Sequence, residues 1–170
     1  MSDAINRLEF HLKEANLQFQ AKPILIGGMA MEYYGFRKSG ADIDLVIRDA
    51  DYQTLALNCP DKRRDLWGDL GVMIKPFEIW RSVARFDYDF FSKDAIDEGI
   101  VFVVSLDRLL FMKILAMDYG AGEKNKNDLQ LIKNHYYKYY VNQDFHNNME
   151  KHMPLYEKNN GVILGGRYFD

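Results

Sequence analysis

The sequence has few of the features that mark secreted proteins, membrane proteins or proteins that bind nucleic acid through a broad basic surface. Its 170 residues include one cysteine, Cys59, so no disulfide can form within the chain. No apolar run approaches the roughly 18 residues needed to cross a bilayer, and the first residues lack the basic-then-apolar order of a signal sequence. Lysine and arginine total 22 against 25 aspartates and glutamates, which excludes a global basic field for nucleic acid. We therefore expect a cytoplasmic protein with no membrane partner.

The composition predicts a globular chain with a core of its own. Hydrophobic residues make up 48% of the sequence and charged residues 28%, both near the averages of globular proteins. A length of 170 residues fits one domain. We predict a single domain over residues 1–170, with a core at about 20–105, a helical part at about 106–158 and a tail at 159–170.

Hydrophobic periodicity predicts helices alternating with short strands. Apolar residues three and four positions apart predict helices at 3–19, 29–34, 51–58, 106–117 and 125–135. Runs of β-branched and aromatic residues predict strands at 23–26, 43–47, 71–75, 77–82, 86–91 and 100–104, and the basic stretch at 60–64 indicates a loop. The order predicts an α/β or α+β class: a short mixed sheet flanked by helices on one side, with a helical C-terminal extension. One more helix is expected within 136–158.

Two aspartates interrupt the apolar run around residues 43–47. Side chains two positions apart on a strand share a face, so Asp42 and Asp44 project together while Ile43 points the other way. Neighbouring carboxylates repel each other, and a divalent cation relieves that repulsion; Mg²⁺ prefers carboxylate oxygens together with phosphates. The alternative is a strand end at which both aspartates are hydrated.

A glycine pair lies where an apolar strand meets a helix. Gly27 and Gly28 carry no side chain, so their backbone N–H groups can approach an anion at the start of the helix. The spacing matches neither the dinucleotide-binding fingerprint nor the P-loop. The alternative is a plain turn, but together with Asp42 and Asp44 the pair describes a phosphate-holding turn facing a metal-holding strand.

The segment 27–47, GGMAMEYYGFRKSGADIDLVI, resembles the core motif of the nucleotidyltransferase superfamily with the DNA polymerase β-like fold. That motif is a glycine pair, a helix and then Asp-x-Asp on a strand. A weaker resemblance to small bacterial members covers 105–131, where the helix carries Lys113 and is followed by a Lys/Asp-rich segment. The resemblance therefore spans roughly 23–132.

The resemblance implies transfer of a nucleoside monophosphate from a nucleoside triphosphate to an acceptor hydroxyl, with release of pyrophosphate. It implies two Mg²⁺ ions, with Mn²⁺ as an alternative, held by Asp42, Asp44 and a third carboxylate on a neighbouring strand that also assists the hydroxyl. We assign that role to Glu78, because it interrupts an apolar strand as the two aspartates do. Asp87 and Asp89, also two positions apart, are the competing candidates.

The remaining candidates would bind the nucleotide. A lysine among apolar helix residues, such as Lys113, is costly to bury without a counter-charge, which a triphosphate would supply; alternatively its stem lies on the core and its head reaches water. Arg37 and Lys38, which follow the first helix of the motif, either bind phosphate or simply lie at the surface of the helix end. We assign nucleotide binding to Gly27, Gly28, Arg37, Lys38, Ser39 and Lys113.

Two departures from the family pattern keep other functions open. Many relatives place threonine or serine two residues before the first aspartate, where this chain has Gly40, with Ser39 one step earlier, and Glu78 replaces the commoner aspartate. One alternative is a non-catalytic binding module of the same fold, the regulatory or antitoxin-like half of a pair with a protein partner. Another is nucleotidylation of an antibiotic. The acceptor is a small molecule, an RNA or a protein. The basic stretch 62–64 is either a hydrated loop or an acceptor-binding patch.

Overall fold

The computed structural model describes residues 2–118, 122–139 and 154. The chain divides into two compact units, one ending at Ser105 and the other beginning at Leu106. The tail expected at 159–170 and nearly all of the helix expected within 136–158 lie outside the described residues. Within the described ranges, no helix is long and apolar enough to cross a membrane.

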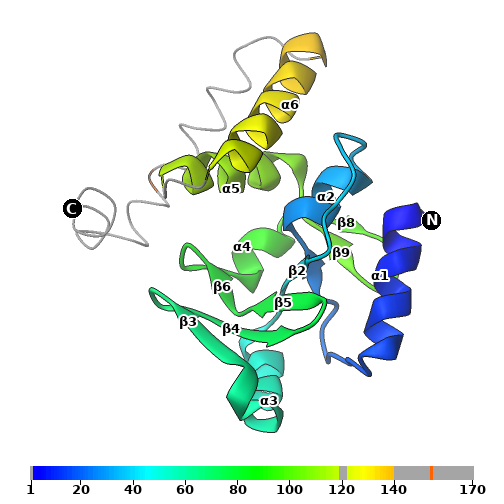
Figure 1. The fold of residues 1–170 in the computed structure, drawn as a ribbon, viewed down its shortest axis with the longest axis vertical. Helices are drawn as coiled ribbons and strands as arrows, with labels where there is room; N and C mark the ends of the chain where they lie inside the picture. Colours follow the sequence, from blue (N-terminus) through cyan, green and yellow to red (C-terminus); the bar gives the residue numbers. More distant parts are fainter. Residues whose placement is uncertain (1, 119–121, 140–153, 155–170) are drawn as a thin grey trace. The chain divides into compact units, whose positions relative to one another are not determined.

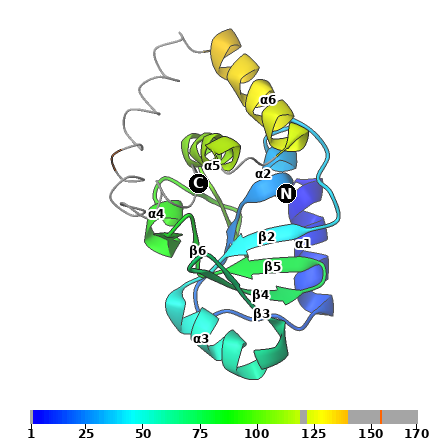
Figure 2. The ribbon, with the colours of Figure 1, turned by 60° about the vertical axis from the view of Figure 1, so that its left-hand side comes forward.

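The first unit is built on a mixed sheet, which confirms the predicted α+β class. Among the described residues, seven strands form this sheet in the order β3-β4-β5-β2-β1-β9-β8. Figures 1 and 2 show four of them, β2 to β5, side by side. Strand β1 pairs antiparallel with β2 and parallel with β9, and β2 pairs parallel with β5. The elements in chain order are α1 (Asp3–Glu14), β1 (Ile24–Leu25), α2 (Gly27–Tyr33), β2 (Ile43–Val46), α3 (Asp49–Asn58), the 3₁₀ turn η1 (Pro60–Lys62), β3 (Arg63–Leu66), β4 (Asp69–Ile74), β5 (Phe77–Trp80), β6 (Ser82–Val83), β7 (Phe86–Asp87), α4 (Tyr88–Ser92), β8 (Ile96–Asp97) and β9 (Phe102–Val103).

The central strands bury alternate side chains, as the period of two requires. Ile43 and Leu45 of β2 and Phe77 and Ile79 of β5 are at most 1% exposed. Each pair lies at matching positions of the two strands, so the four side chains share one face of the sheet. The carboxylates of β2 and β5 alternate with them and therefore lie on the opposite face.

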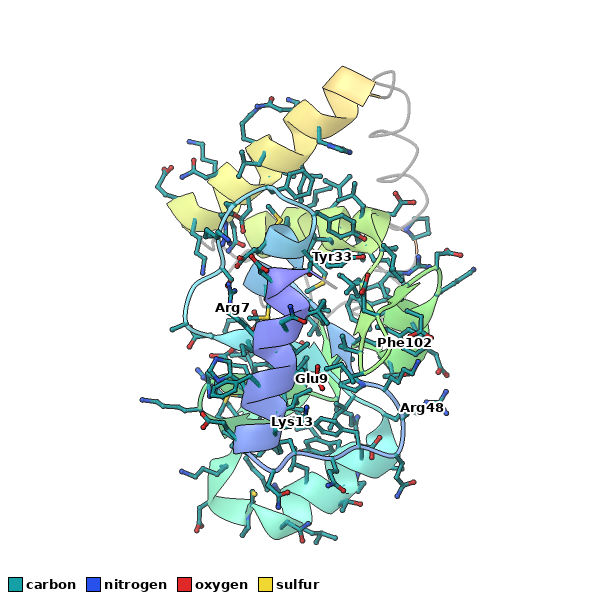
Figure 3. All side chains as sticks on the ribbon, turned by 90° about the vertical axis from the view of Figure 1, so that its right-hand side faces the viewer. Arg7, Glu9, Lys13, Tyr33, Arg48 and Phe102 are labelled. Atoms are coloured by element: carbon teal, nitrogen blue, oxygen red, sulfur yellow. The ribbon has the colours of Figure 1, made fainter. Side chains whose placement is uncertain are left out.

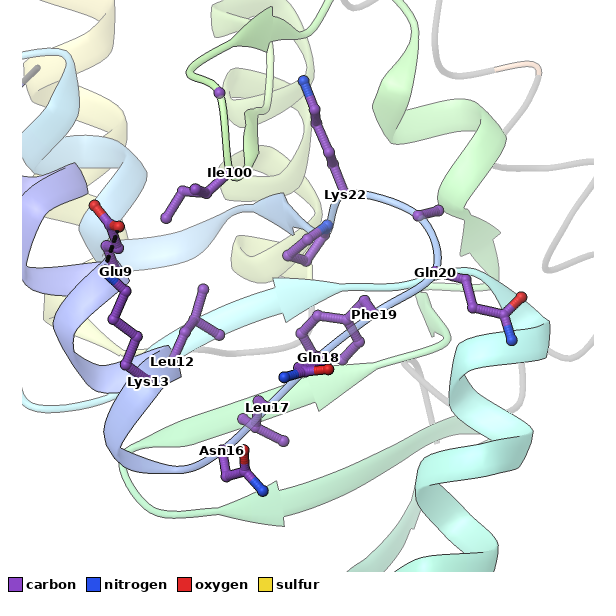
Figure 4. Close-up of a pocket in the computed structure, with 13 residues that line it drawn as sticks. Glu9, Leu12, Lys13, Asn16, Leu17, Gln18, Phe19, Gln20, Lys22 and Ile100 are labelled. Atoms are coloured by element: carbon purple, nitrogen blue, oxygen red, sulfur yellow. Dashed lines mark hydrogen bonds and ion pairs between the residues drawn. The ribbon is translucent and has the colours of Figure 1, made fainter.

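The first helix is shorter than its hydrophobic pattern predicts. Helix α1 ends at Glu14, and Asn16 has φ +50°, a left-handed conformation that no helix continues through. The chain then runs as a loop across one face of β2, β5 and β4, between α1 and α3 (Figure 4). Asp51 of α3 anchors this loop by accepting hydrogen bonds from Gln20 N at 2.7 Å and Ala21 N at 3.2 Å. The prediction of a helix to residue 19 was wrong, because the chain turns at Asn16 and Leu17 and Phe19 are half-buried from the loop instead of from a helix.

Two further sequence expectations are corrected by local hydrogen bonding and pairing. The strand expected at 86–91 ends at Asp87, whose carboxylate caps α4 by accepting a hydrogen bond from Phe90 N at 3.1 Å. The loop expected at 60–64 instead enters strand β3, which pairs antiparallel with β4 and is exposed along its whole length. A strand at a sheet edge needs no buried face. Because β3 consists mostly of charged residues, its hydrophobicity pattern did not predict a strand.

The second unit contains helices α5 (Leu106–Asp118) and α6 (Glu123–Tyr139), which pack against each other. Both were expected, although α6 extends beyond the predicted 125–135. A buried ion pair joins them: Lys113 Nζ lies 2.7 Å from Asp128 Oδ2 and donates a hydrogen bond to Asn125 Oδ1 at 3.2 Å.

Candidate functional site

Two of the predicted metal ligands occupy matching positions on neighbouring parallel strands. Asp44 of β2 is the direct partner of Glu78 of β5. Both residues are half-buried. Adjacent strands lie about 4.8 Å apart, and directly paired residues point to the same face, so the two carboxylates project side by side.

The first glycine of the motif lies directly against the side chain of Asp44. Helix α2 begins at Gly27, two residues earlier than the sequence predicts, and Gly27 has φ +63°. A Cβ atom at Gly27 would overlap Asp44 Oδ2 and would lie 2.7 Å from Asp44 Cγ. The Asp44 carboxylate therefore occupies the space that any other residue at position 27 would fill, and glycine is required on both conformational and steric grounds.

The second glycine lies against a guanidinium group. A Cβ atom at Gly28 would be 3.7 Å from Arg37 Nη1 and 3.9 Å from Gly40 N. Arg37 Nη1 also donates a hydrogen bond to Lys38 O at 2.9 Å. Of the residues predicted to bind the nucleotide, Gly27 thus lies against Asp44, and its neighbour Gly28 lies near Arg37.

The third predicted ligand, Asp42, lies one residue before β2 and is exposed. Within the described ranges, no three side chains of histidine, cysteine, aspartate or glutamate are gathered closely enough to hold one metal ion. Asp44 and Glu78 are thus paired in the sheet, while Asp42 is not drawn in with them. The donor set itself suits magnesium, because it consists of hard carboxylate oxygens whose mutual repulsion a cation would relieve.

The competing carboxylates are placed elsewhere. Asp87 lies on β7, which pairs with β6 in a separate two-stranded sheet, and its side chain caps α4. Asp89 is an exposed residue in the first turn of α4. Neither lies on a strand that neighbours β2, whereas Glu78 does.

Two residues assigned to the nucleotide contact a glutamate instead. Ser39 N donates to Glu32 Oε2 at 2.8 Å, and Lys38 Nζ lies 3.0 Å from Glu32 Oε1. Arg7 of α1 makes a two-pronged ion pair with the same carboxylate, at 2.8 and 3.1 Å. With Arg7 as the largest contributor, these donors hold the pKa of Glu32 well below its usual value of 4.5.

Sequence reasoning missed both Arg7 and Glu32. Glu32 falls inside the motif helix, where a single glutamate carries no periodic signal, and Arg7 lies 25 positions away on the polar face of α1. The only available signal was that the motif contains one acidic residue between its glycines and its aspartates.

Lys113, the remaining nucleotide-binding candidate, already has a counter-charge within its own unit. Its side chain is 10% exposed and its partner Asp128 is 0% exposed. The reasoning that a buried ammonium needs an anion holds, but Asp128 supplies that anion in the structure.

A cavity of about 420 Å³ lies away from these groups. The end of α1, the loop that follows it and the turn between β8 and β9 line this cavity (Figure 4). None of the predicted site residues borders it.

Comparison of the chain with models of protein families finds no match, and a search among curated proteins finds none either.

Proposed function

We propose that this chain is a metal-dependent nucleotidyltransferase that transfers a nucleoside monophosphate from a nucleoside triphosphate to an acceptor hydroxyl. The observation that carries the proposal is the pairing of Asp44 with Glu78 beside a glycine whose missing side chain makes room for Asp44. Two adjacent carboxylates next to a glycine pair and an arginine combine ligands for a cation with groups that bind phosphate. The resemblance of segment 27–47 to the superfamily motif supports the same activity.

Each residue has a distinct part in the proposed reaction. Asp44 and Glu78, with Asp42, would hold the magnesium ions, which supply charge neutralisation at the reacting phosphate when bound. Arg37 and the backbone of Gly27–Gly28 bind and orient the β- and γ-phosphates. The acceptor oxygen then forms its bond to the α-phosphorus, the bond to the β-phosphate oxygen breaks, and pyrophosphate leaves. Glu78 takes the proton of the acceptor hydroxyl.

The proposal is tested by magnesium-dependent stabilisation. A nucleoside triphosphate with Mg²⁺ raises the Tm of the wild-type protein, because a ligand that binds only the folded state stabilises it. The magnesium-dependent part of the shift disappears in the variant Asp42→Asn/Asp44→Asn. The matched control is Asp87→Asn/Asp89→Asn, which removes two aspartates of the same spacing outside the site and keeps the shift. An equal shift in the wild type and in Asp42→Asn/Asp44→Asn refutes the metal site.

A second candidate function is a non-catalytic binding module of the same fold, with a regulatory or antitoxin-like role. The exposed position of Asp42, apart from the Asp44–Glu78 pair, favours it. Incubation of a cell extract with each labelled triphosphate, Mg²⁺ and the protein separates the two. A labelled acceptor that disappears with Glu78→Gln supports transfer, whereas nucleotide binding without any labelled acceptor supports the module.

A further inference from the structure

A cluster of four residues joins α1 to the loop that carries part of the candidate site. We call Arg7, Glu32, Lys38 and Ser39 the Glu32 clamp. In addition to the contacts of Glu32 described above, Arg7 Nη2 donates a hydrogen bond to Ser39 Oγ at 3.0 Å. Figure 3 labels Arg7 on α1, with Glu9 and Lys13 further along the same helix. The clamp thus connects α1, α2 and the loop 35–42.

The clamp combines an exposed cation, Arg7 at 43% side-chain exposure, with a shielded carboxylate. The Glu32 side chain is 7% exposed and accepts bonds from a guanidinium fork and from a backbone N–H. Charge-assisted, two-pronged contacts to a shielded carboxylate are stronger and more directional than exposed pairs. The Lys38 side chain is 81% exposed and adds little, so Arg7 and Ser39 N carry the interaction.

The loop held by the clamp positions two site residues. It leaves α2 through Gly35, which has φ +77°, and ends one residue before β2. Arg37 lies two positions before Ser39, and Asp42 lies three positions after it. Fixing the Ser39 backbone therefore restricts both the guanidinium beside Gly28 and the carboxylate that precedes Asp44.

We propose that Arg7 and Glu32 are positioning residues for the nucleotide site. Through Ser39 they hold the loop 35–42, so that Arg37 stays beside Gly28 and the backbone of Asp42, the residue before β2, is restricted. The proposal rests on the proposed function in assigning a nucleotide to the site. It makes α1, which carries no predicted ligand, a required part of that site.

Three variants on two helices test the proposal. Arg7→Ala and Glu32→Gln break the clamp. Arg7→Lys keeps the positive charge but cannot make the bidentate contact of a guanidinium group. The matched control is Lys13→Ala, which removes an exposed pair on α1, Lys13 with Glu9 at 2.7 Å, that does not reach the loop. Trypsin cleaves after Arg37 and Lys38, so mass spectrometry of a limited digest reports the freedom of the loop, with cleavage after the exposed Lys93 as the internal reference.

The expected result is selective. In Arg7→Ala and Glu32→Gln, cleavage after Arg37 and Lys38 relative to Lys93 rises about tenfold, as expected for the loss of one charge-assisted contact. The dissociation constant for a nucleoside triphosphate with Mg²⁺ rises by a similar factor. Arg7→Lys lies between these variants and the wild type, and Lys13→Ala matches the wild type in both measurements.

Three outcomes decide against the proposal or against the proposed function. Cleavage that rises equally at Lys93 means that the clamp only stabilises the fold, which overturns the proposal. Loop cleavage and nucleotide affinity equal to those of Lys13→Ala overturn it as well. A wild-type protein that binds no triphosphate with Mg²⁺ refutes the proposed function. The digest then decides alone whether the clamp holds the loop. Cleavage after Arg37 and Lys38 that is unchanged in Arg7→Ala and Glu32→Gln shows that the clamp does not hold it.

Discussion

Asp44 and Glu78 are direct partners across the parallel strands β2 and β5, so two acidic side chains project from neighbouring positions of one sheet. Like charges at such positions destabilise a sheet when nothing lies between them. The pairing also brings a residue of the motif next to one 34 positions further along the chain. The two adjacent carboxylates are the basis on which we propose a bound cation at this site.

Substitution of Glu78 by glutamine separates stability from catalysis. Without Mg²⁺, Glu78→Gln has a Tm equal to or above that of the wild type, because the repulsion with Asp44 is removed. Transfer falls by about 10²–10⁴-fold, as is typical when an acid–base group is lost. Differential scanning calorimetry and a single-turnover transfer assay measure the two effects. A marked fall in Tm without metal would show that Glu78 is a structural residue.

A methyl group at position 27 disrupts the site by displacing Asp44. Gly27→Ala costs about 1–2 kcal/mol of stability from the left-handed backbone alone, and its Cβ would overlap Asp44 Oδ2. The control is Gly99→Ala, because Gly99 has φ +82° and open space around the added carbon. Calorimetry should show that both variants lose stability, but only Gly27→Ala should lose the magnesium-dependent nucleotide shift. Retention of the shift in Gly27→Ala would contradict the proposed place of Asp44 in the site.

The Glu32 clamp makes stability depend on pH in the acid range. The pKa of Glu32 is lowered in the folded protein, chiefly by Arg7, so its contribution is present above the usual value of 4.5 and is lost as the pH falls through the lowered value. The Tm difference between the wild type and Glu32→Gln should therefore be largest near pH 7 and shrink below 4.5. Thermal melts by circular dichroism from pH 7 to pH 3 measure it. A difference that does not change with pH would rule out the ionised carboxylate as its source.

Loss of Lys113 destabilises the second unit by removing the ammonium beside a buried carboxylate. Lys113→Met is expected to cost about 3–5 kcal/mol, and Lys113→Met/Asp128→Leu should recover most of that loss. The control is Lys126→Met, whose pair with Glu123 is exposed and 3.8 Å long, and which should change stability by less than about 0.5 kcal/mol. Urea unfolding followed by circular dichroism compares them. If Lys113→Met leaves stability unchanged, the ion pair is not structural and a nucleotide-binding role for Lys113 gains support.

The sequence by itself identified the features that depend on neighbours along the chain. A strand that ends at glycines, an Asp-x-Asp pair on another strand and a glutamate inside an apolar run are local patterns. The physical rule behind each of them is local too, namely side-chain alternation or backbone freedom. These patterns predicted the α+β class and singled out Asp42 and Asp44, and the resemblance to the superfamily motif added the expectation of a third carboxylate, which was assigned to Glu78.

Only the tertiary structure decided which distant groups meet. Periodicity shows which face of α1 is polar, but not that Arg7 on this face reaches Glu32 and Ser39. It also could not show that Asp51 would bind the backbone of the loop that follows α1, or that Asp128 would neutralise Lys113. Hydrogen bonds and ion pairs between remote residues depend on the three-dimensional path of the backbone, and a one-dimensional pattern carries no record of that path.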